Sequence, residues 1–276
     1  MRKVAAPVFY YIVMTLAALL MLAPVGWMLS TSLKPEKDVL SATPRWIPET
    51  TTTQHFTDLF TQSQDFPVAR WIANSFGLAI TQTVLVLFIA SMAAFALSRL
   101  QYRGRETLFR GIVATMILPA QVTLIPVFLV VVKLGLFNTY GALILPGLGG
   151  AFGVFLLRQF FQSIPVELEE AAYLDGAGPW IIYSRVCLPL VKPALATLAI
   201  FTFMGSWNDF VWPLIATNDV NLRTLPVGLT IFQGRYVTEY GITMAAAVVA
   251  TIPMVIAFAI FQKRVTEGIA LQGLKG

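Results

Sequence analysis

Residues 170–189 read EAAYLDGAGPWIIYSRVCLP, a polar and glycine-punctuated stretch in a chain that is otherwise strongly apolar. Polar side chains and irregular backbone cost free energy in the hydrocarbon of a bilayer. We therefore expect this stretch to lie outside a membrane, as a short helix and a turn held between two membrane spans. A membrane protein that keeps such an element, and has no nucleotide site of its own, is expected to use it to dock another protein.

The composition indicates a membrane protein. Of the 276 residues, 57% are hydrophobic and 12% are charged, whereas soluble domains are about 45–50% apolar and about 25% charged. The net charge of +5 does not indicate nucleic-acid binding, because membrane loops collect lysine and arginine for topological reasons. The single cysteine, Cys187, excludes an intrachain disulfide and a cysteine metal cluster. We expect no catalytic residues, no metal and no nucleic-acid partner.

Six segments are long and apolar enough to cross about 30 Å of hydrocarbon: about 8–30, 72–97, 111–132, 141–161, 194–216 and 242–262. They predict an all-α polytopic protein in which residues 1–276 form a single transmembrane domain. The first segment is expected to be a retained span, because it is too long for a signal peptide and lacks a small-residue cleavage site. With both termini in the cytoplasm, 12 of the 19 basic residues face inside, which favours that orientation. The loop 162–193 between spans four and five is then cytoplasmic, and loop 31–71 is an irregular external connection.

The sequence around residue 170 predicts a short helix. Pro165 suits the first turn of a helix, and the glutamates at 167, 169 and 170 place negative charge at the positive end of its dipole. Ala171 and Ala172 keep one face slim, so that a partner surface can approach closely.

Asp175-Gly176 is expected to end this helix, because glycine accepts the left-handed backbone of a helix stop. A second short helical stretch then ends at Leu188-Pro189. The same residues also fit an amphipathic connector lying on the membrane surface, and the local pattern does not separate the two interpretations.

Glu170-Ala171-Ala172, with Gly176, Val186 and Leu188-Pro189, resembles the EAA loop of binding-protein-dependent ABC importer permeases. The likeness extends over at least residues 72–276. It includes LLRQFFQSIPVELEEAAYLDGA, LPLVKPALATLAIF, GSWNDFVWPL, LRTLPVGL and EGIALQGLKG, which are similar to the carbohydrate-uptake, maltose-type permeases and among them to the G-type inner-membrane subunit. Val186 stands where the family usually has isoleucine, and Leu271-Gln272 where it commonly has small residues.

The resemblance implies that the EAA helix is a coupling helix seated in a cleft of a cytoplasmic ATPase subunit, with Glu170 paired to a basic group there. The ATPase-coupling residues it implies are Glu170, Ala171, Ala172, Asp175, Gly176, Leu188 and Pro189.

The resemblance also implies the partners: a second, homologous permease subunit in a heterodimer, two ATPase subunits that bind ATP and Mg, an extracellular or periplasmic binding protein, and the lipid of a bacterial cytoplasmic (inner) membrane. This chain has no G-x-x-x-x-G-K-[ST] phosphate loop, so we expect no enzyme activity and no bound cofactor.

The fifth span contains GSWNDFVWPL, in which Asn208 and Asp209 are unusual residues at hydrocarbon depth. An amide flanked by aromatic rings could offer hydrogen bonds and flat apolar surfaces to a sugar. Alternatively, Asn208 and Asp209 tie this helix to the partner permease or cap a break before Pro213, and Asp209 is the more structural candidate of the two. Helical spacing predicts one shared face for Phe201, Gly205, Asn208 and Trp212.

Two further regions are candidates for contact with substrate or partner. Gln121 and Thr123 lie between Pro119 and Pro126, where a kinked helix could line a substrate path. The alternative is an ordinary kink, in which the Thr123 hydroxyl satisfies a backbone carbonyl that a proline leaves free. Loop 217–241 is predicted to be external. The resemblance implies contact with the binding protein there, and a solvated connector is the alternative. The candidate residues are Arg223, Thr224, Gly234 and Arg235.

The sequence thus predicts a permease subunit of an ATP-driven importer for a sugar or related polyol. A glycerol-3-phosphate-type permease is an alternative, and a secondary transporter with Asp209 as proton carrier is a weaker one. An intramembrane protease is disfavoured, because Ser206 has no neighbouring base and no HExxH motif is present. His55 is expected to be a surface residue and Cys187 a packing residue.

Overall fold

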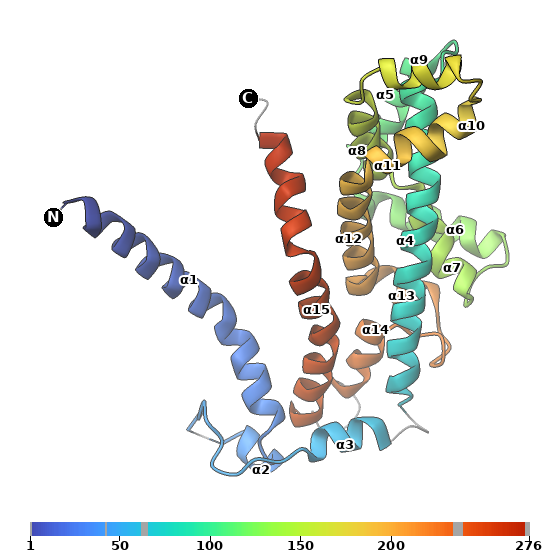
Figure 1. Ribbon diagram of the computed structural model, residues 1–276. Coiled ribbons are helices and arrows are strands. Elements are labelled where there is room, and N and C mark those ends of the chain that lie inside the picture. The colour runs from blue at the N-terminus through green and yellow to red at the C-terminus, as the bar shows by residue number, and fades with distance from the viewer. Residues whose placement is uncertain (1, 42, 62–65, 234–239, 274–276) are drawn as a thin grey trace. The chain divides into compact units, whose positions relative to one another are not determined.

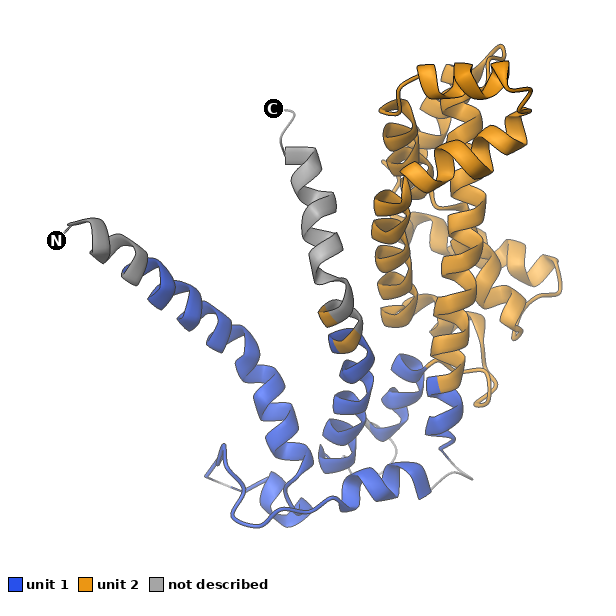
Figure 2. Cartoon of the chain, viewed as in Figure 1, with its two compact units in different colours: residues 1–72, 225–255 blue, residues 73–224, 256–276 orange. Residues whose placement is uncertain are grey.

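The computed structural model of the chain describes residues 2–41, 43–61, 66–233 and 240–273. All regular secondary structure across these residues is helical, which confirms the predicted all-α class (Figure 1). The chain divides into two compact units, shown in separate colours in Figure 2: residues 1–72 with 225–255, and residues 73–224 with 256–276.

The first unit contains the N-terminal helix and several short ones. Its elements are α1 (Arg2–Ser32), α2 (Glu36–Val39), α3 (Gln54–Thr61), the start of α4 (Val68–Arg99), α14 (Leu225–Leu229), the 3-10 helix Thr230–Gln233 and the first part of α15 (Tyr240–Gly273). Loop 31–71 is therefore not the irregular connection that the sequence predicts, because it contains α2 and α3.

The second unit contains the rest of α4 and the elements that follow it. These are α5 (Arg105–Thr115), α6 (Ala120–Lys133), α7 (Tyr140–Ile144), the 3-10 helix Leu145–Gly149, α8 (Ala151–Gln162), α9 (Glu167–Leu174), α10 (Pro179–Ile181), the π-helix Ile182–Cys187, α11 (Leu188–Leu190), α12 (Lys192–Asn208) and α13 (Val211–Ala216).

Among the described residues, two helices are by themselves long and apolar enough to span a membrane: Phe9–Ser32 within α1, and α4. Three further pairs reach that length only together. They are bent by 102° between α5 and α6, by 43° between residues 140–149 and α8, and by 78° between residues 179–190 and α12. A shorter apolar helix covers Tyr240–Ile256.

The predicted spans 111–132 and 194–216 are thus not continuous helices. The first is broken before Pro119, which has no backbone N–H and has extended ψ as the residue preceding α6. The second is broken at Asp209, whose backbone is extended between α12 and α13. The last helix runs to Gly273, beyond the predicted end of the sixth span at residue 262.

One large apolar cluster holds the second unit together. It joins the C-terminal half of α4 to α8, the start of α12 and the π-helix, and its most buried members include Ala94, Leu157, Phe161, Ile182 and Cys187. Glycine at 153 permits this packing, since a Cβ there would lie 3.0 Å from Ala90 and 3.1 Å from Leu198. The predicted packing role of Cys187 is confirmed, because its side chain is buried in this cluster.

In the first unit, a carboxylate holds the start of α15. Glu36 accepts hydrogen bonds from the backbone N–H groups of Tyr240 and Gly241, both at 3.1 Å. His55 lies beside it, with Nε2 3.8 Å from the Glu36 carboxylate and 2.8 Å from the Lys34 carbonyl oxygen. The prediction that His55 is a surface residue is wrong: the ring is buried because it fills the space under the first turn of α15.

We expect Glu36→Ala to lower the thermal stability of the protein, because the first turn of α15 loses both the acceptor of two N–H groups and a favourable charge, together about 1 kcal/mol. Thermal unfolding in detergent measures this. Lys37→Ala, at the exposed neighbouring position, is the matched control. Equal melting temperatures for the two variants would show that the cap is unimportant.

Candidate functional site

Helix α9 and its stop form the centre of the site. The helix runs Glu167–Leu174 and ends in a Schellman motif, in which the Gly176 N–H donates to the Tyr173 carbonyl at 3.0 Å and the Ala177 N–H to the Ala172 carbonyl at 2.9 Å. Gly176 has φ +82°, a left-handed conformation that other residues rarely adopt. The predicted helix stop at Asp175-Gly176 is present. Pro165 lies two residues before the helix rather than inside its first turn.

Helix α9 has two different faces. Glu170 and Ala171 are exposed, as is Leu174, whose side chain is 90% accessible. Ala172 instead packs against the apolar cluster under the helix. Ala171 is thus exposed, whereas Ala172 is only partly exposed, because the helical turn brings it against the cluster.

The polypeptide after the stop is a second helical stretch, as expected, but it extends beyond Leu188-Pro189. α10, the π-helix Ile182–Cys187 and α11 follow one another to Leu190, and α12 begins at Lys192. Pro189 has no N–H for the carbonyl four residues before it, which favours the wider π pattern just upstream. Leu188 packs against the apolar cluster, whereas Pro189 is exposed.

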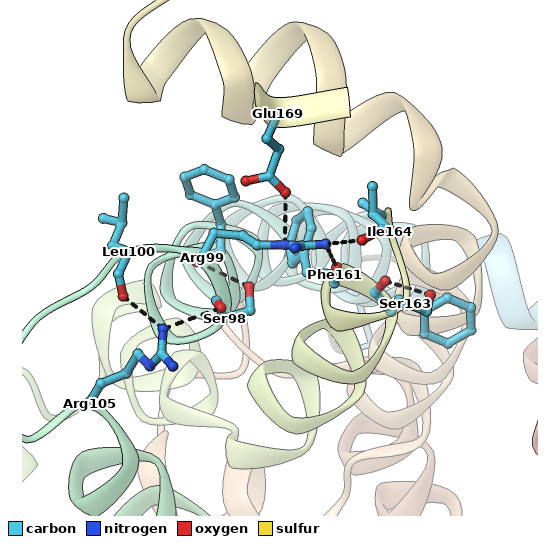
Figure 3. Close-up of polar contacts among 10 residues, drawn as sticks. Ser98, Arg99, Leu100, Arg105, Phe161, Ser163, Ile164 and Glu169 are labelled. Carbon is cyan, nitrogen blue, oxygen red and sulfur yellow. Dashed lines mark hydrogen bonds and ion pairs between the residues drawn. The ribbon is translucent and has the colours of Figure 1, made fainter. Parts of the chain in front are cut away.

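A buried ion pair fastens α9 from below (Figure 3). Arg99, the last residue of α4, places Nε 2.9 Å from Oε1 of Glu169, and each side chain is only 9% exposed. The same guanidinium donates to the carbonyls of Phe161 and, at 2.6 Å, Ile164, at the end of α8. Sequence reasoning missed both members of this pair. It counted Arg99 as a topological charge and Glu169 as one of three dipole-facing glutamates.

Two more arginines hold the same end of the unit. Arg158 on α8 donates to the Leu97 carbonyl at 3.2 Å, pairs with Glu106 at 2.7 Å and lies over the Phe109 ring. Arg105 donates to the Leu100 carbonyl at 3.0 Å (Figure 3). These carbonyls belong to the last turn and end of α4, where no intrahelical donor remains.

The Cys187 thiol lies against this ion pair. Burial raises the pKa of Cys187 to about 12, and the negative charge of Glu169 adds to the shift. The side chain is therefore a protonated packing residue rather than a nucleophile.

The fifth predicted span divides its candidate residues between two helices. Gly205 and Asn208 are exposed on α12, and the Asn208 amide donates to the Met204 carbonyl at 2.9 Å. Trp212 lies on α13 and donates its indole N–H to the Ala142 carbonyl at 2.9 Å. The predicted common face of Phe201, Gly205, Asn208 and Trp212 is wrong for Trp212, because the helix ends at Asn208.

Asp209 has the position of a cap at this break. Its Oδ1 accepts from the Trp212 N–H at 3.4 Å, and its backbone is extended. This geometry corresponds to the structural alternative that the sequence left open for Asp209.

Gln121 and Thr123 lie on the first turns of α6, immediately after the bend at Pro119. Gln121 is exposed, whereas the Thr123 hydroxyl donates to the Ala120 carbonyl at 2.9 Å and is satisfied within its own helix. A neighbouring molecule could therefore meet the Gln121 amide, and the partly exposed Thr123 hydroxyl could still accept a hydrogen bond.

The loop before α14 is ordered by Asn74 of α4. The Asn74 amide donates to the carbonyls of Asn221 and Arg223, at 2.8 and 2.9 Å, and its oxygen accepts from the Tyr140 hydroxyl at 2.8 Å. Arg223 is partly exposed, whereas Thr224 is 3% exposed. Gly234 and Arg235, the other two candidates in this loop, lie outside the described residues.

We expect Gly176→Ala to destabilise the α9 stop by about 1 kcal/mol, because alanine must adopt a left-handed backbone although its Cβ meets nothing within 4 Å. Gly176→Asn should cost less, since asparagine tolerates this conformation. Thermal unfolding of the purified protein gives the order.

Gly178→Ala is the control for this series, because Gly178 has an ordinary φ of −78° and equally open space around it. If Gly176→Ala and Gly178→Ala melted at the same temperature, the left-handed stop would contribute nothing.

Comparison with known proteins places this geometry in context. Residues 87–270 match a family described as "Binding-protein-dependent transport system inner membrane component". The chain is 35% identical to the arabinooligosaccharides transport system permease protein AraQ of Halalkalibacterium halodurans, over 83% of this chain and 81% of that protein. It is also 35% identical to the sulfoquinovosyl glycerol transport system permease protein SmoH of Agrobacterium fabrum, over 92% and 89% of the two chains.

A solved structure resembles the fold over almost its whole length. It is a chain of a bacterial ABC transporter involved in the import of the acidic polysaccharide alginate, with a TM-score of 0.83 and 26% identity over 95% of this chain and 97% of that one. The helical breaks described above thus occur within a fold of known type.

Proposed function

Because this chain belongs to the family of binding-protein-dependent transport system inner membrane components, we propose that it is the permease subunit through which an ATP-driven importer moves a sugar or related polyol. The observation that carries the proposal is the geometry of α9: a short exposed helix with a left-handed stop, held on a buried ion pair and lying within the matched family region. An element of this kind is suited to dock a partner protein and to move with it.

The substrate class rests on the relatives. Two of them are transport system permease proteins for arabinooligosaccharides and for sulfoquinovosyl glycerol, and the similar solved structure is of a transporter involved in the import of an acidic polysaccharide. We therefore propose a glycan or glycoside as cargo, either neutral or acidic. The capped position of Asp209 does not favour the alternative of a proton-driven transporter, because its carboxylate has a structural task.

The protein is an integral membrane protein, and we propose six spans with both termini on the cytoplasmic side of a bacterial inner membrane. The apolar helices and bent pairs support this arrangement if residues 105–133 and 140–162 each contribute one broken span, α12 of the third pair contributes the fifth and Tyr240–Ile256 the last. The excess of basic residues at the proposed cytoplasmic ends supports the orientation.

In this arrangement the chain pairs with a second, homologous permease subunit, and two cytoplasmic ATPase subunits bind ATP and Mg. A binding protein outside the membrane delivers the cargo. Glu170 and Ala171 on the exposed face of α9 would contact an ATPase subunit, with Glu170 against a basic group. Asp175, Gly176 and Leu188-Pro189 would shape and fix the ends of that contact.

The proposed substrate path uses the exposed polar positions. Asn208 and Gly205 on α12 are accessible, and Gln121 on α6 is a further polar group. Trp212 and Thr123 stay candidates, although their polar hydrogens are donated to backbone carbonyls, as the Asn208 amide is to Met204. Contact of loop 217–241 with the binding protein remains a proposal, with Arg223 as its accessible candidate among the described residues.

We expect Glu170→Ala to leave the protein inserted and assembled but to lower substrate uptake per ATP about tenfold or more, the usual loss when one partner of a close interfacial charge pair is removed. Uptake and ATP hydrolysis measured together in proteoliposomes test this. Glu167→Ala, also exposed on α9, is the control. Normal uptake per ATP in Glu170→Ala would remove Glu170 from the coupling contact.

We expect Asn208→Ala to raise the substrate concentration for half-maximal uptake about fivefold, equivalent to one net hydrogen bond of about 1 kcal/mol. Assembly and ATP-driven closure should be unchanged. Ser206→Ala on the same helix is the control. Loss of the partner permease from the purified Asn208→Ala complex would instead identify Asn208 as a helix-packing residue.

A further inference from the structure

The buried contact under α9 joins three elements that are far apart in the sequence. One guanidinium, on Arg99 at the end of α4, holds Glu169 of α9 and the carbonyls of Phe161 and Ile164 after α8 (Figure 3). Of the three glutamates at the start of α9, only Glu169 is buried, whereas Glu167 and Glu170 are exposed. The helix thus presents one carboxylate inward and two outward.

We propose that the Arg99–Glu169 ion pair is the link that transmits movement of α9 to the membrane helix α4, which makes both side chains positioning residues for energy coupling. This inference rests on the proposed function, in which an ATPase subunit pushes on the outer face of α9. It adds a role for the inner face of α9, through which the movement is transmitted to the rest of the permease.

Local geometry favours this pair over the surrounding apolar contacts. α9 has only eight residues and is followed by a glycine stop, so it cannot carry force along its own axis into α4. Hydrophobic attraction has no direction, so the apolar contacts of α9 do not by themselves select α4 as the helix that follows its movement. The Arg99 guanidinium is fixed by two carbonyl acceptors, so its ion pair with Glu169 keeps a defined distance.

The surroundings make separation of the pair costly. Both side chains are buried, so moving α9 away from α4 would leave the Glu169 carboxylate without its charge partner and Arg99 with only the carbonyls of Phe161 and Ile164. The adjacent Cys187 is fully buried as well, and burial is the main cause that raises its pKa. α4 and α9 therefore move together or separate only at a large cost.

Stability alone does not explain the pair. Replacing both members of a buried ion pair by apolar residues is often neutral or stabilising, whereas removing one member is strongly destabilising. A structural role and a transmission role thus predict different behaviour for the double variant. This difference makes the proposal testable.

The test uses the complete complex with its partner permease, ATPase subunits and binding protein in proteoliposomes, and compares Arg99→Met, Glu169→Leu and the double variant. We expect the double variant to melt above Arg99→Met, because it no longer buries the Glu169 charge without a partner, although both variants lose the donor to the carbonyls of Phe161 and Ile164. Its uptake per ATP should nevertheless stay about fivefold or more below wild type, at the lower end of typical coupling between sites. A double variant that folds and couples normally would overturn the proposal.

Two controls separate this link from general damage. Arg105→Met removes the side chain that caps Leu100 at the same helix end without touching α9, and it should lower stability while leaving uptake per ATP unchanged. If the double variant does not assemble, the test instead compares uptake per ATP in the milder variant Glu169→Gln with that in the exposed control Glu167→Gln. Equal uptake per ATP in those two variants would also overturn the proposal.

The ATPase subunits report separately on the proposed function. They should co-purify with Arg99→Met and Glu169→Leu as they do with wild type, because the outer face of α9 is unchanged. Absence of ATPase subunits from the wild-type complex would contradict the proposed function itself. Intact docking with intact uptake per ATP in the variants would contradict only the transmission role.

Discussion

The second unit depends on hydrogen-bond donors for the backbone carbonyls at the C-terminal ends of α4 and α8. Helix ends leave carbonyls without intrahelical donors, and here they lie beneath α9 and its neighbours. Arginine side chains supply the donors: Arg158 for Leu97, Arg105 for Leu100, and Arg99 for the end of α8. Because a guanidinium carries five donors, Arg99 can serve two carbonyls and still hold Glu169. Helix α9 is built on these capped ends.

The same arginines show what could and could not be predicted from the sequence. The helical class and the stop at Gly176 follow from local signals, namely apolar length and the left-handed tolerance of glycine. The basic turn after α4 was interpreted only as topology, since charge counts carry no information about partners. Arg99 and Glu169 are 70 positions apart in the chain, and no local pattern indicates that they meet. The packing of Ala172 against the apolar cluster was missed for the same reason.

The central membrane segments illustrate a second limit. Apolar composition locates a span but does not say whether the helix is continuous across it. Pro119 gives a clear local cause for one break, whereas Asp209 was weighed both as a path residue and as a cap, and only the geometry of its Trp212 contact distinguishes them. His55 was misplaced because its burial depends on α15, nearly 190 residues later in the chain.

The buried thiol of Cys187 makes this protein convenient for site-directed chemistry. Its side chain is fully buried and burial raises its pKa to about 12, whereas the thiolate is the species that reacts with maleimides and alkyl halides. Cys187 should therefore react with such reagents more slowly than a cysteine introduced at an exposed position. Fluorophores, spin labels and crosslinkers can then be directed to introduced cysteines while Cys187 keeps its packing beneath α9.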